Sequence, residues 1–275
     1  MTKSIGYLGP IGTFTEQAAI LYDTDATLIP LSSVSAIAEA VYDGTLDEGV
    51  VPIENSLQGS VPDTLDLLIH DTTLMISREI IIPIELCLMT KPETRKNEIE
   101  IVYSHPMAIG QCRKYLALEH KNAIQIASLS TATAVEDMLK SEKISAAIGN
   151  SRASEIYGVT ILDKEIQDNK TNHTRFVVLS KHDHKATGSD KTSLCFSFSA
   201  DQAGMLHSVL GCFAERDINL AKVESRPNKT GLGEYVFLLD IEGHREDSNV
   251  KRALEQMIDK VSFIKLFGSY PKYNY

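Results

Sequence analysis

Two short polar motifs carry the residue types best suited to chemistry. Glu54, Asn55 and Ser56 directly follow an apolar run, and Thr174 and Arg175 directly precede another. A carboxylate can transfer a proton, amides and hydroxyls can hydrogen-bond an anion, and an arginine can hold a carboxylate through two parallel bonds. A hydrogen-bonded turn at the first motif and an exposed ion pair at the second are the simpler interpretations of each motif alone.

Hydroxyl groups also gather where helices are expected to begin. Residues 6–16 read GYLGPIGTFTE, a glycine-rich turn with Thr13, which matches neither of the common nucleotide-binding loops. Ser104, His105 and Thr131 precede or open two further helical patterns. Helix N-termini favour anions, so these starts can receive a carboxylate, although plain N-capping explains each of them equally simply. His105 is either an acid–base group or, more simply, a structural histidine.

Alternating strand and helix patterns must position these residues. The expected strands are Ile5–Leu8, Thr27–Pro30, Gly49–Ile53, Leu74–Leu88, Ile99–Tyr103, Ile124–Ala127, Ile144–Ile148 and Phe176–Leu179. The expected helices are Thr15–Tyr22, Val34–Tyr42, Pro62–Ile69, Met107–Leu118, Ala132–Leu139 and Ser151–Tyr157. Such alternation predicts βαβ units and a largely parallel sheet. The long run Leu74–Leu88 and the weakly patterned stretch Ile161–Asn172 favour two lobes joined by crossing segments, an arrangement that commonly forms a ligand cleft.

The pattern changes after the polar segment Lys181–Lys191, which is typical of a linker. The elements expected beyond it are a strand at Thr192–Ser199, a helix through Met205–Phe213, strands at Ile218–Ser225 and Tyr235–Ile241, a helix at Val250–Ile258 and a strand at Ser262–Tyr270. A turn is expected at Asn228–Gly233. This βαββαβ order predicts a ferredoxin-like module.

Composition limits the class of protein. The chain has 275 residues and a net charge of −10, with no basic stripe, so we expect about two domains and no nucleic-acid partner. Its four cysteines are widely spaced and predict buried free thiols rather than a metal site or disulfides. The first residues do not resemble a signal peptide and no apolar run is long enough for a membrane span, so we expect a cytoplasmic protein with no membrane partner.

The order of the motifs is more specific than any one of them. GYLGPIGTFTEQAA, VPIENSLQGSV, SHP, STATA, NHTRF and ESRP follow one another along nearly the whole chain. This order resembles the prephenate dehydratase family, with a C-terminal ACT domain. The resemblance implies an α/β fold with a two-lobed, periplasmic-binding-protein-like catalytic domain at residues 1–181, whose second lobe covers about 85–158, and a ferredoxin-like ACT domain at 191–275.

The resemblance also implies a reaction and its residues. The substrate is prephenate, a dicarboxylate that loses water and carbon dioxide to give phenylpyruvate, with no cofactor and no metal. Thr174 is the implied catalytic residue, and Glu54 is an implied proton source. The implied substrate contacts are Thr13, Asn55, Ser56, Ser104, Gln111, Thr131, Arg175 and Phe176.

The C-terminal part resembles ACT domains that bind L-phenylalanine between subunits, which implies feedback inhibition and a homodimer or homotetramer. The implied effector residues are Gly204, Met205, Leu206, Glu224, Ser225, Arg226 and Pro227. The first effector motif departs from the usual Gly-Ala-Leu-Val, because Met205 and His207 make it GMLH. The strength and selectivity of effector binding therefore stay open.

Two alternatives remain at the level of sequence. The substrate can be arogenate, the amino-acid form of prephenate, because that choice depends on one amine-versus-keto contact. The chain can also be a two-lobed amino-acid sensor without catalysis, although such a sensor would not need the polar motifs around Glu54 and Thr174.

Overall fold

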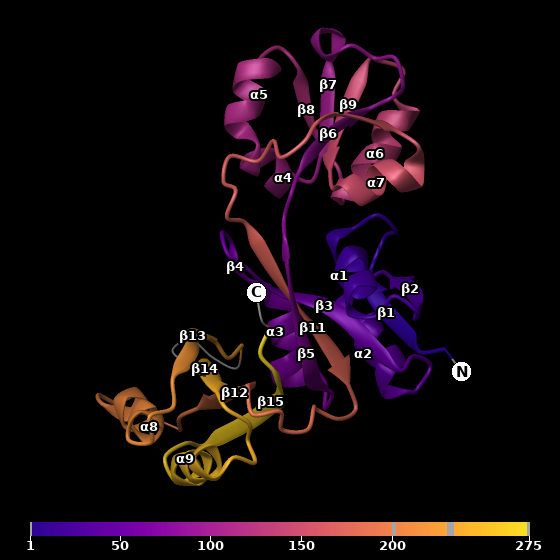
Figure 1. Ribbon diagram of the computed structural model, residues 1–275. Helices are drawn as coiled ribbons and strands as arrows, with labels where there is room; N and C mark the ends of the chain where they lie inside the picture. The colour runs from indigo at the N-terminus through magenta and orange to yellow at the C-terminus, as the bar shows by residue number, and fades with distance from the viewer. Residues whose placement is uncertain (1, 200–201, 230–233, 274–275) are drawn as a thin grey trace. The chain divides into compact units, whose positions relative to one another are not determined.

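The computed structural model describes residues 2–199, 202–229 and 234–273, which form three β-sheets with flanking helices (Figure 1). The chain packs into two compact units. The first consists of Met1–Ile37, Val50–Val61 and Ile81–Phe176, and the second of Ala38–Gly49, Pro62–Ile80 and Val177–Tyr275. Every predicted catalytic and substrate-binding residue belongs to the first unit, and every predicted effector residue belongs to the second.

The first sheet has six strands in the order β2-β1-β3-β11-β5, with β4 paired to β3. Its strands are β1 (Ser4–Leu8), β2 (Thr27–Leu31), β3 (Glu48–Asn55), β4 (Gly59–Ser60), β5 (Met75–Pro83) and β11 (His173–Ser180). Strands β1 and β2 are parallel and are joined through helix α1 (Phe14–Tyr22), as the expected βαβ unit requires. Helix α2 (Val34–Tyr42) precedes β3. The neighbouring positions of β3 and β11 bring the two polar motifs to one sheet although they are far apart in sequence.

The second sheet has five strands in the order β10-β6-β9-β7-β8. They are β6 (Cys87–Thr90), β7 (Ile101–Ser104), β8 (Ile124–Ala127), β9 (Ser145–Gly149) and β10 (Thr160–Asp163). Strand β7 is parallel to β8 and β9, but β6 and β10 run antiparallel to their neighbours, so the expectation of a largely parallel sheet holds only for part of it. The helices of this region are η2 (Lys96–Glu98), α4 (Pro106–Gln111), α5 (Arg113–Glu119), α6 (Thr131–Lys140) and α7 (Ser151–Tyr157).

Two expected elements are interrupted. The run Leu74–Leu88 divides into β5 and β6, because β5 ends at Pro83, which has no N–H to donate to a ladder. Between the strands, Ile84 N donates to Asn172 O at 2.8 Å and Leu86 N to Gln167 Oε1 at 2.9 Å. The expected helix Met107–Leu118 is likewise divided, into α4 and α5, at Cys112.

The third sheet confirms the βαββαβ prediction. Its elements are β12 (Asp190–Ser197), α8 (Met205–Ala214), β13 (Leu220–Pro227), β14 (Tyr235–Glu242), α9 (Ser248–Ile258) and β15 (Phe263–Pro271), and the strand order is β13-β14-β12-β15. All the pairs are antiparallel, and helices α8 and α9 cover the sheet through one apolar core that includes Phe196, Phe213 and Met257 (Figure 1). The expected turn at Asn228–Gly233 lies mostly outside the described residues.

A buried ion pair ties the third sheet to β5 within the second unit. Lys191 Nζ lies 2.9 and 2.8 Å from the two carboxylate oxygens of Glu79, and Tyr273 N donates to the same carboxylate at 3.0 Å. The side chains of Glu79 and Lys191 are only 2% and 12% exposed. The unit also contains α3 (Pro62–Asp66) and the π-helix η1 (Leu67–Asp71). Across the described part of the chain, each helix is too short or too polar to cross a bilayer.

Replacing Glu79 by alanine should destabilise the chain strongly, because the buried Lys191 ammonium would lose its carboxylate. We expect the free energy of unfolding in urea to fall by about 3–5 kcal/mol. Glu255→Ala, on the exposed face of α9, is the matched control and should change it by no more than about 0.5 kcal/mol. Equal losses in the two variants would contradict this account of the ion pair.

Candidate active site

A cavity of about 280 Å³ in the first unit is bordered by the N-termini of three helices and by strands β3 and β11. The helices are α1, α4 and α6. The residues that line the cavity are Thr13, Phe14, Thr15, Pro52, Asn55, Gln58, Val61, Ile84, Leu86, His105, Met107, Ala108, Gln111, Leu129, Ser130, Thr131, Thr174 and Phe176. These described lining residues include no Asp, Glu, Lys or Arg, so hydroxyls, amides and one imidazole supply the polar surface.

The glycine-rich turn sets the first wall. Thr13 is the N-cap of α1: its Oγ1 accepts from Glu16 N at 3.3 Å and donates to Leu8 O at 3.1 Å. Gly12 has φ +88°, and a Cβ there would lie 3.5 Å from Ala132 Cβ at the start of α6. A contact of that length is ordinary, so it is the left-handed backbone of the turn that favours glycine at this position.

Serine and histidine caps form the second wall. Ser130 Oγ accepts from Thr133 N at 2.9 Å and caps α6, and His105 Nδ1 accepts from Met107 N at 3.3 Å and caps α4. Burial lowers the pKa of His105, so its ring is neutral at pH 7 and its acceptor nitrogen can serve as the cap. Ser104 is fully buried and donates to Ile148 O at 2.7 Å, away from the cavity lining.

The side chain of Asn55 joins the end of β3 to the beginning of β11. Asn55 Nδ2 donates to Asn172 Oδ1 at 2.8 Å, to Thr174 Oγ1 at 2.9 Å and to His173 O at 3.2 Å. Gln111, from α4, extends this network because its Oε1 accepts from Asn172 Nδ2 at 3.0 Å. The network thereby fixes the Thr174 hydroxyl, which lines the cavity.

The remaining predicted contacts point to other partners in this conformation. Arg175 Nη2 lies 3.1 Å from Glu54 Oε2, and neither residue lines the cavity. Thr174 and Phe176 do line it, as expected when alternate residues of a strand face one side. Ser56 is exposed: its Oγ donates to Thr171 O at 3.2 Å and accepts from His173 N at 3.0 Å.

The structure therefore gathers part of the predicted substrate set around one cavity. Those lining it are Thr13, Asn55, Gln111, Thr131, Thr174 and Phe176. Those outside its lining are Glu54, Ser56, Ser104 and Arg175, and their roles stay predictions.

Sequence reasoning did not single out the apolar wall of the cavity. Phe14, Ile84, Leu86 and Leu129 belong to it. Ile84 and Leu86 fall in the segment that was expected to be one continuous strand, although Pro83 marks the place where β5 ends. Leu129 is 91% exposed, and only its place before the Ser130 cap could have identified it as a residue of the cavity wall.

The predicted effector residues occupy two places in the ACT-like module. Gly204, with φ +87°, immediately precedes α8, which Met205 and Leu206 begin. Glu224 lies in β13, 3.0 Å from Lys222. In the same strand Arg226 pairs with Asp66 of α3, and Lys229 lies 2.5 Å from that carboxylate.

No cluster of three or more His, Cys, Asp or Glu side chains suited to a metal ion occurs within residues 2–199, 202–229 and 234–273. All four cysteines are buried and free, as predicted. Burial raises the pKa of Cys112 and of Cys195 to about 12, so these thiols stay protonated.

One solved structure with a similar fold is described as an acylase. It is the structure of GqqA, described as a novel type of quorum quenching acylase, and it is 26% identical with a TM-score of 0.87 over 98% of both chains. The named activity belongs to that protein. The likeness shows that overall fold alone does not decide the reaction.

Family models and other relatives are consistent with one another. The prephenate dehydratase model matches residues 5–184, and the ACT domain model matches residues 196–259. The bifunctional chorismate mutase/prephenate dehydratase of Aquifex aeolicus (strain VF5) is 41% identical over 269 residues, covering 98% of this chain and 73% of the relative. The structure of a prephenate dehydratase from Arthrobacter aurescens in complex with L-Phe is 34% identical, with a TM-score of 0.91 over 98% of this chain and 90% of that one. The chain therefore belongs to the prephenate dehydratase family and carries an ACT domain at its C-terminal end.

Proposed function

We propose that this chain converts prephenate to phenylpyruvate in the cytoplasm and that L-phenylalanine inhibits it through the ACT domain. In this proposal residues 1–181 form the catalytic domain, with a second lobe at about 85–158, and residues 191–275 form the regulatory domain. The observation that carries the proposal is the Thr174 hydroxyl, which Asn55 fixes at the wall of a cavity lined by neutral donors and apolar side chains.

The reaction needs one proton and no cofactor. The ring hydroxyl leaves with a proton as water, the bond to the ring carboxylate breaks to release carbon dioxide, and that electron pair completes the aromatic ring. The enzyme accelerates this step by stabilising the departing oxygen more strongly in the transition state than in the bound substrate.

Thr174 suits the role of donor to the departing oxygen. Its Oγ1 accepts from Asn55 Nδ2 at 2.9 Å, which leaves its own O–H to donate. A threonine does not titrate near neutral pH, so it positions and polarises rather than acting as a strong acid. We retain Glu54 as the proton source because of the family resemblance; here its carboxylate pairs with Arg175.

The cavity also suits a doubly negative substrate. The starts of α1, α4 and α6 direct the positive ends of their peptide dipoles toward it, and Thr13, Gln111 and Thr131 offer hydroxyl or amide groups. Phe14, Ile84 and Phe176 offer apolar surface to the ring. Arg175 supplies a carboxylate contact in this proposal when it exchanges Glu54 for the substrate.

The ACT domain gives the proposed route of regulation. The related Arthrobacter aurescens structure is a complex with L-Phe. The effector residues that the family resemblance implies for this chain are Gly204, Met205 and Leu206 with Glu224, Ser225, Arg226 and Pro227. Arg226 is paired with Asp66 of α3, so a movement of the end of β13 on effector binding would be passed to α3 through this ion pair. Binding between subunits requires at least a dimer, and the proposal is a homodimer or homotetramer with dyad symmetry.

Thr174→Ala should lower kcat/KM for prephenate at least about tenfold, equivalent to about 1.4 kcal/mol of barrier. Phenylpyruvate formation measures the rate, and Thr174→Ser is the matched control because it keeps the hydroxyl. A fully active alanine variant would remove Thr174 from the mechanism.

Parallel assays with prephenate and with arogenate decide between the two substrates, because arogenate would give phenylalanine as the product. If the protein turns over neither compound, the sensor alternative remains.

His105→Asn should flatten the pH dependence of stability. Because the folded pKa of His105 is lowered by burial, the unfolded chain binds its proton more readily, and the folded state loses stability as pH falls below about 6.5. Asparagine keeps a capping acceptor but does not titrate. Urea unfolding at about pH 7.5 and about pH 5.5 should therefore show a smaller loss in the variant than in the wild type. The exposed His70→Asn is the control, and identical pH slopes in all three proteins would contradict the prediction.

Glu224→Gln should weaken feedback inhibition. If Glu224 holds the amine of L-phenylalanine, losing its charge should raise the concentration for half-inhibition at least about tenfold. Rates are normalised to turnover without L-phenylalanine, and Glu255→Gln on α9 is the control. No effect of L-phenylalanine on the wild-type rate would contradict the regulatory proposal, while leaving the catalytic one intact.

A further inference from the structure

The helix beside the cavity is broken at Cys112. The break leaves two backbone groups, the Gln111 carbonyl and the Lys114 N–H, without their usual helical partners. Helix α4 ends at Gln111, α5 begins at Arg113, and Cys112 between them has φ −111° and ψ 20°. In an uninterrupted α-helix each N–H donates to the carbonyl four residues earlier. The break removes that pairing, and Cys112, at the N-cap position of α5, makes no side-chain capping bond.

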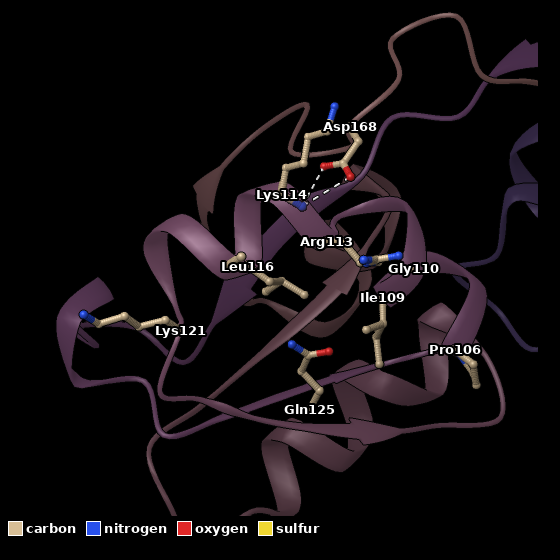
Figure 2. A pocket seen from close by; sticks show the side chains of 10 residues that line it. Pro106, Ile109, Gly110, Arg113, Lys114, Leu116, Lys121, Gln125 and Asp168 are labelled. Atoms are coloured by element: carbon tan, nitrogen blue, oxygen red, sulfur yellow. Dashed lines mark hydrogen bonds between the residues drawn. The ribbon is translucent and has the colours of Figure 1, made fainter.

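Asp168 satisfies both sides of the break from a distant loop. Its backbone N donates to Gln111 O at 2.6 Å, and its carboxylate oxygens accept from Lys114 N at 3.1 and 3.2 Å. Figure 2 shows the two bonds from Lys114 as dashed lines. Asp168 thus acts as a bracket that holds the end of α4 and the start of α5 in fixed positions.

The bracket bears on the active site through Gln111. Gln111 Oε1 accepts from Asn172 Nδ2 at 3.0 Å, and Asn172 Oδ1 accepts from Asn55 Nδ2 at 2.8 Å. Asn55 in turn donates to Thr174 Oγ1 at 2.9 Å. The Asp168 bracket therefore holds the backbone of Gln111, and a series of hydrogen bonds leads from the Gln111 side chain to the proposed catalytic hydroxyl.

We propose that Asp168 is a positioning residue for the dehydratase reaction, which sets the side chain of Gln111 by clamping the helix break at Cys112. This inference rests on the proposed function and adds to it a residue outside the cavity lining. Asp168 is solvent-exposed and has no ion-pair partner among the described residues, so its carboxylate is engaged chiefly by the backbone of α5.

The matching variants separate positioning from a general structural role. Asp168→Ala removes the acceptor for Lys114 N, whereas Asp168→Asn keeps an oxygen of the same reach. We expect Asp168→Ala to lower kcat about tenfold with a smaller change in KM, and Asp168→Asn to stay within about threefold of the wild type. Glu165→Gln, an exposed acid of the same loop that pairs with Lys170, should leave kcat unchanged.

A double-mutant cycle with Gln111→Ala tests the proposed route. If Asp168 acts through Gln111, adding Asp168→Ala to Gln111→Ala should lower kcat by less than about twofold, because the two residues act as a unit. Independent, multiplying losses would overturn the proposal. So would wild-type kcat in the folded Asp168→Ala protein, whose folding is checked by circular dichroism.

A readout that needs no turnover keeps this test distinct from that of the proposed function. Side-chain amide resonances of Asn55, Gln111 and Asn172 should shift in the NMR spectrum of Asp168→Ala and not in that of Glu165→Gln. Unshifted amides would overturn the positioning role even if the enzyme turns over prephenate. Shifted amides in Asp168→Ala, together with a wild-type protein that does not turn over prephenate, would support the bracket and reject the reaction.

Discussion

The carboxamide of Asn55 is the constraint on which the candidate site depends. Its nitrogen donates to Asn172, His173 and Thr174, and its oxygen accepts from the backbone of Leu57 at 3.0 Å and of Gln58 at 3.1 Å. The two N–H donors determine which end of the amide is the carbonyl, and so determine which end faces Thr174. A fully used amide of this kind loses several bonds at once if it rotates, so the network is rigid. It joins segments 117 to 119 residues apart without any charged group.

Local signals predicted the parts of this site that depend on neighbours in sequence. Thr13 and Thr131 are expected at helix starts from their residue types, and in the structure Thr13 caps α1 and Thr131 is the first residue of α6. The polar motifs at Asn55 and Thr174 were expected at the ends of strands. The alternating pattern does not give the strand order, so it could not predict that β3 pairs with β11. The ferredoxin-like module was predictable because its order of elements is short, regular and complete.

Tertiary hydrogen bonds decided the parts that local signals could not predict. Ser104 has the type and place of a ligand contact, but its hydroxyl donates a hydrogen bond to the Ile148 carbonyl instead. The helix expected across Cys112 contains Gly110, which weakens a helix but does not fix where it breaks. The partners for the break come from Asp168, more than fifty residues later in the chain. Residue type shows which bonds a side chain can make, whereas the choice among partners is made by the assembled fold.

The absence of acidic groups from the cavity lining is a requirement of the chemistry as much as a feature of the fold. An ionised carboxylate about 4 Å from one substrate carboxylate would cost about 4 kcal/mol at an effective dielectric constant of about 20, and prephenate has two carboxylates. The carboxylate of Glu54 lies close to the site in sequence, and its pairing with Arg175 at 3.1 Å sets its charge against a cation. That ion pair offsets the negative charge of the carboxylate that the proposal places beside an anion-binding cavity.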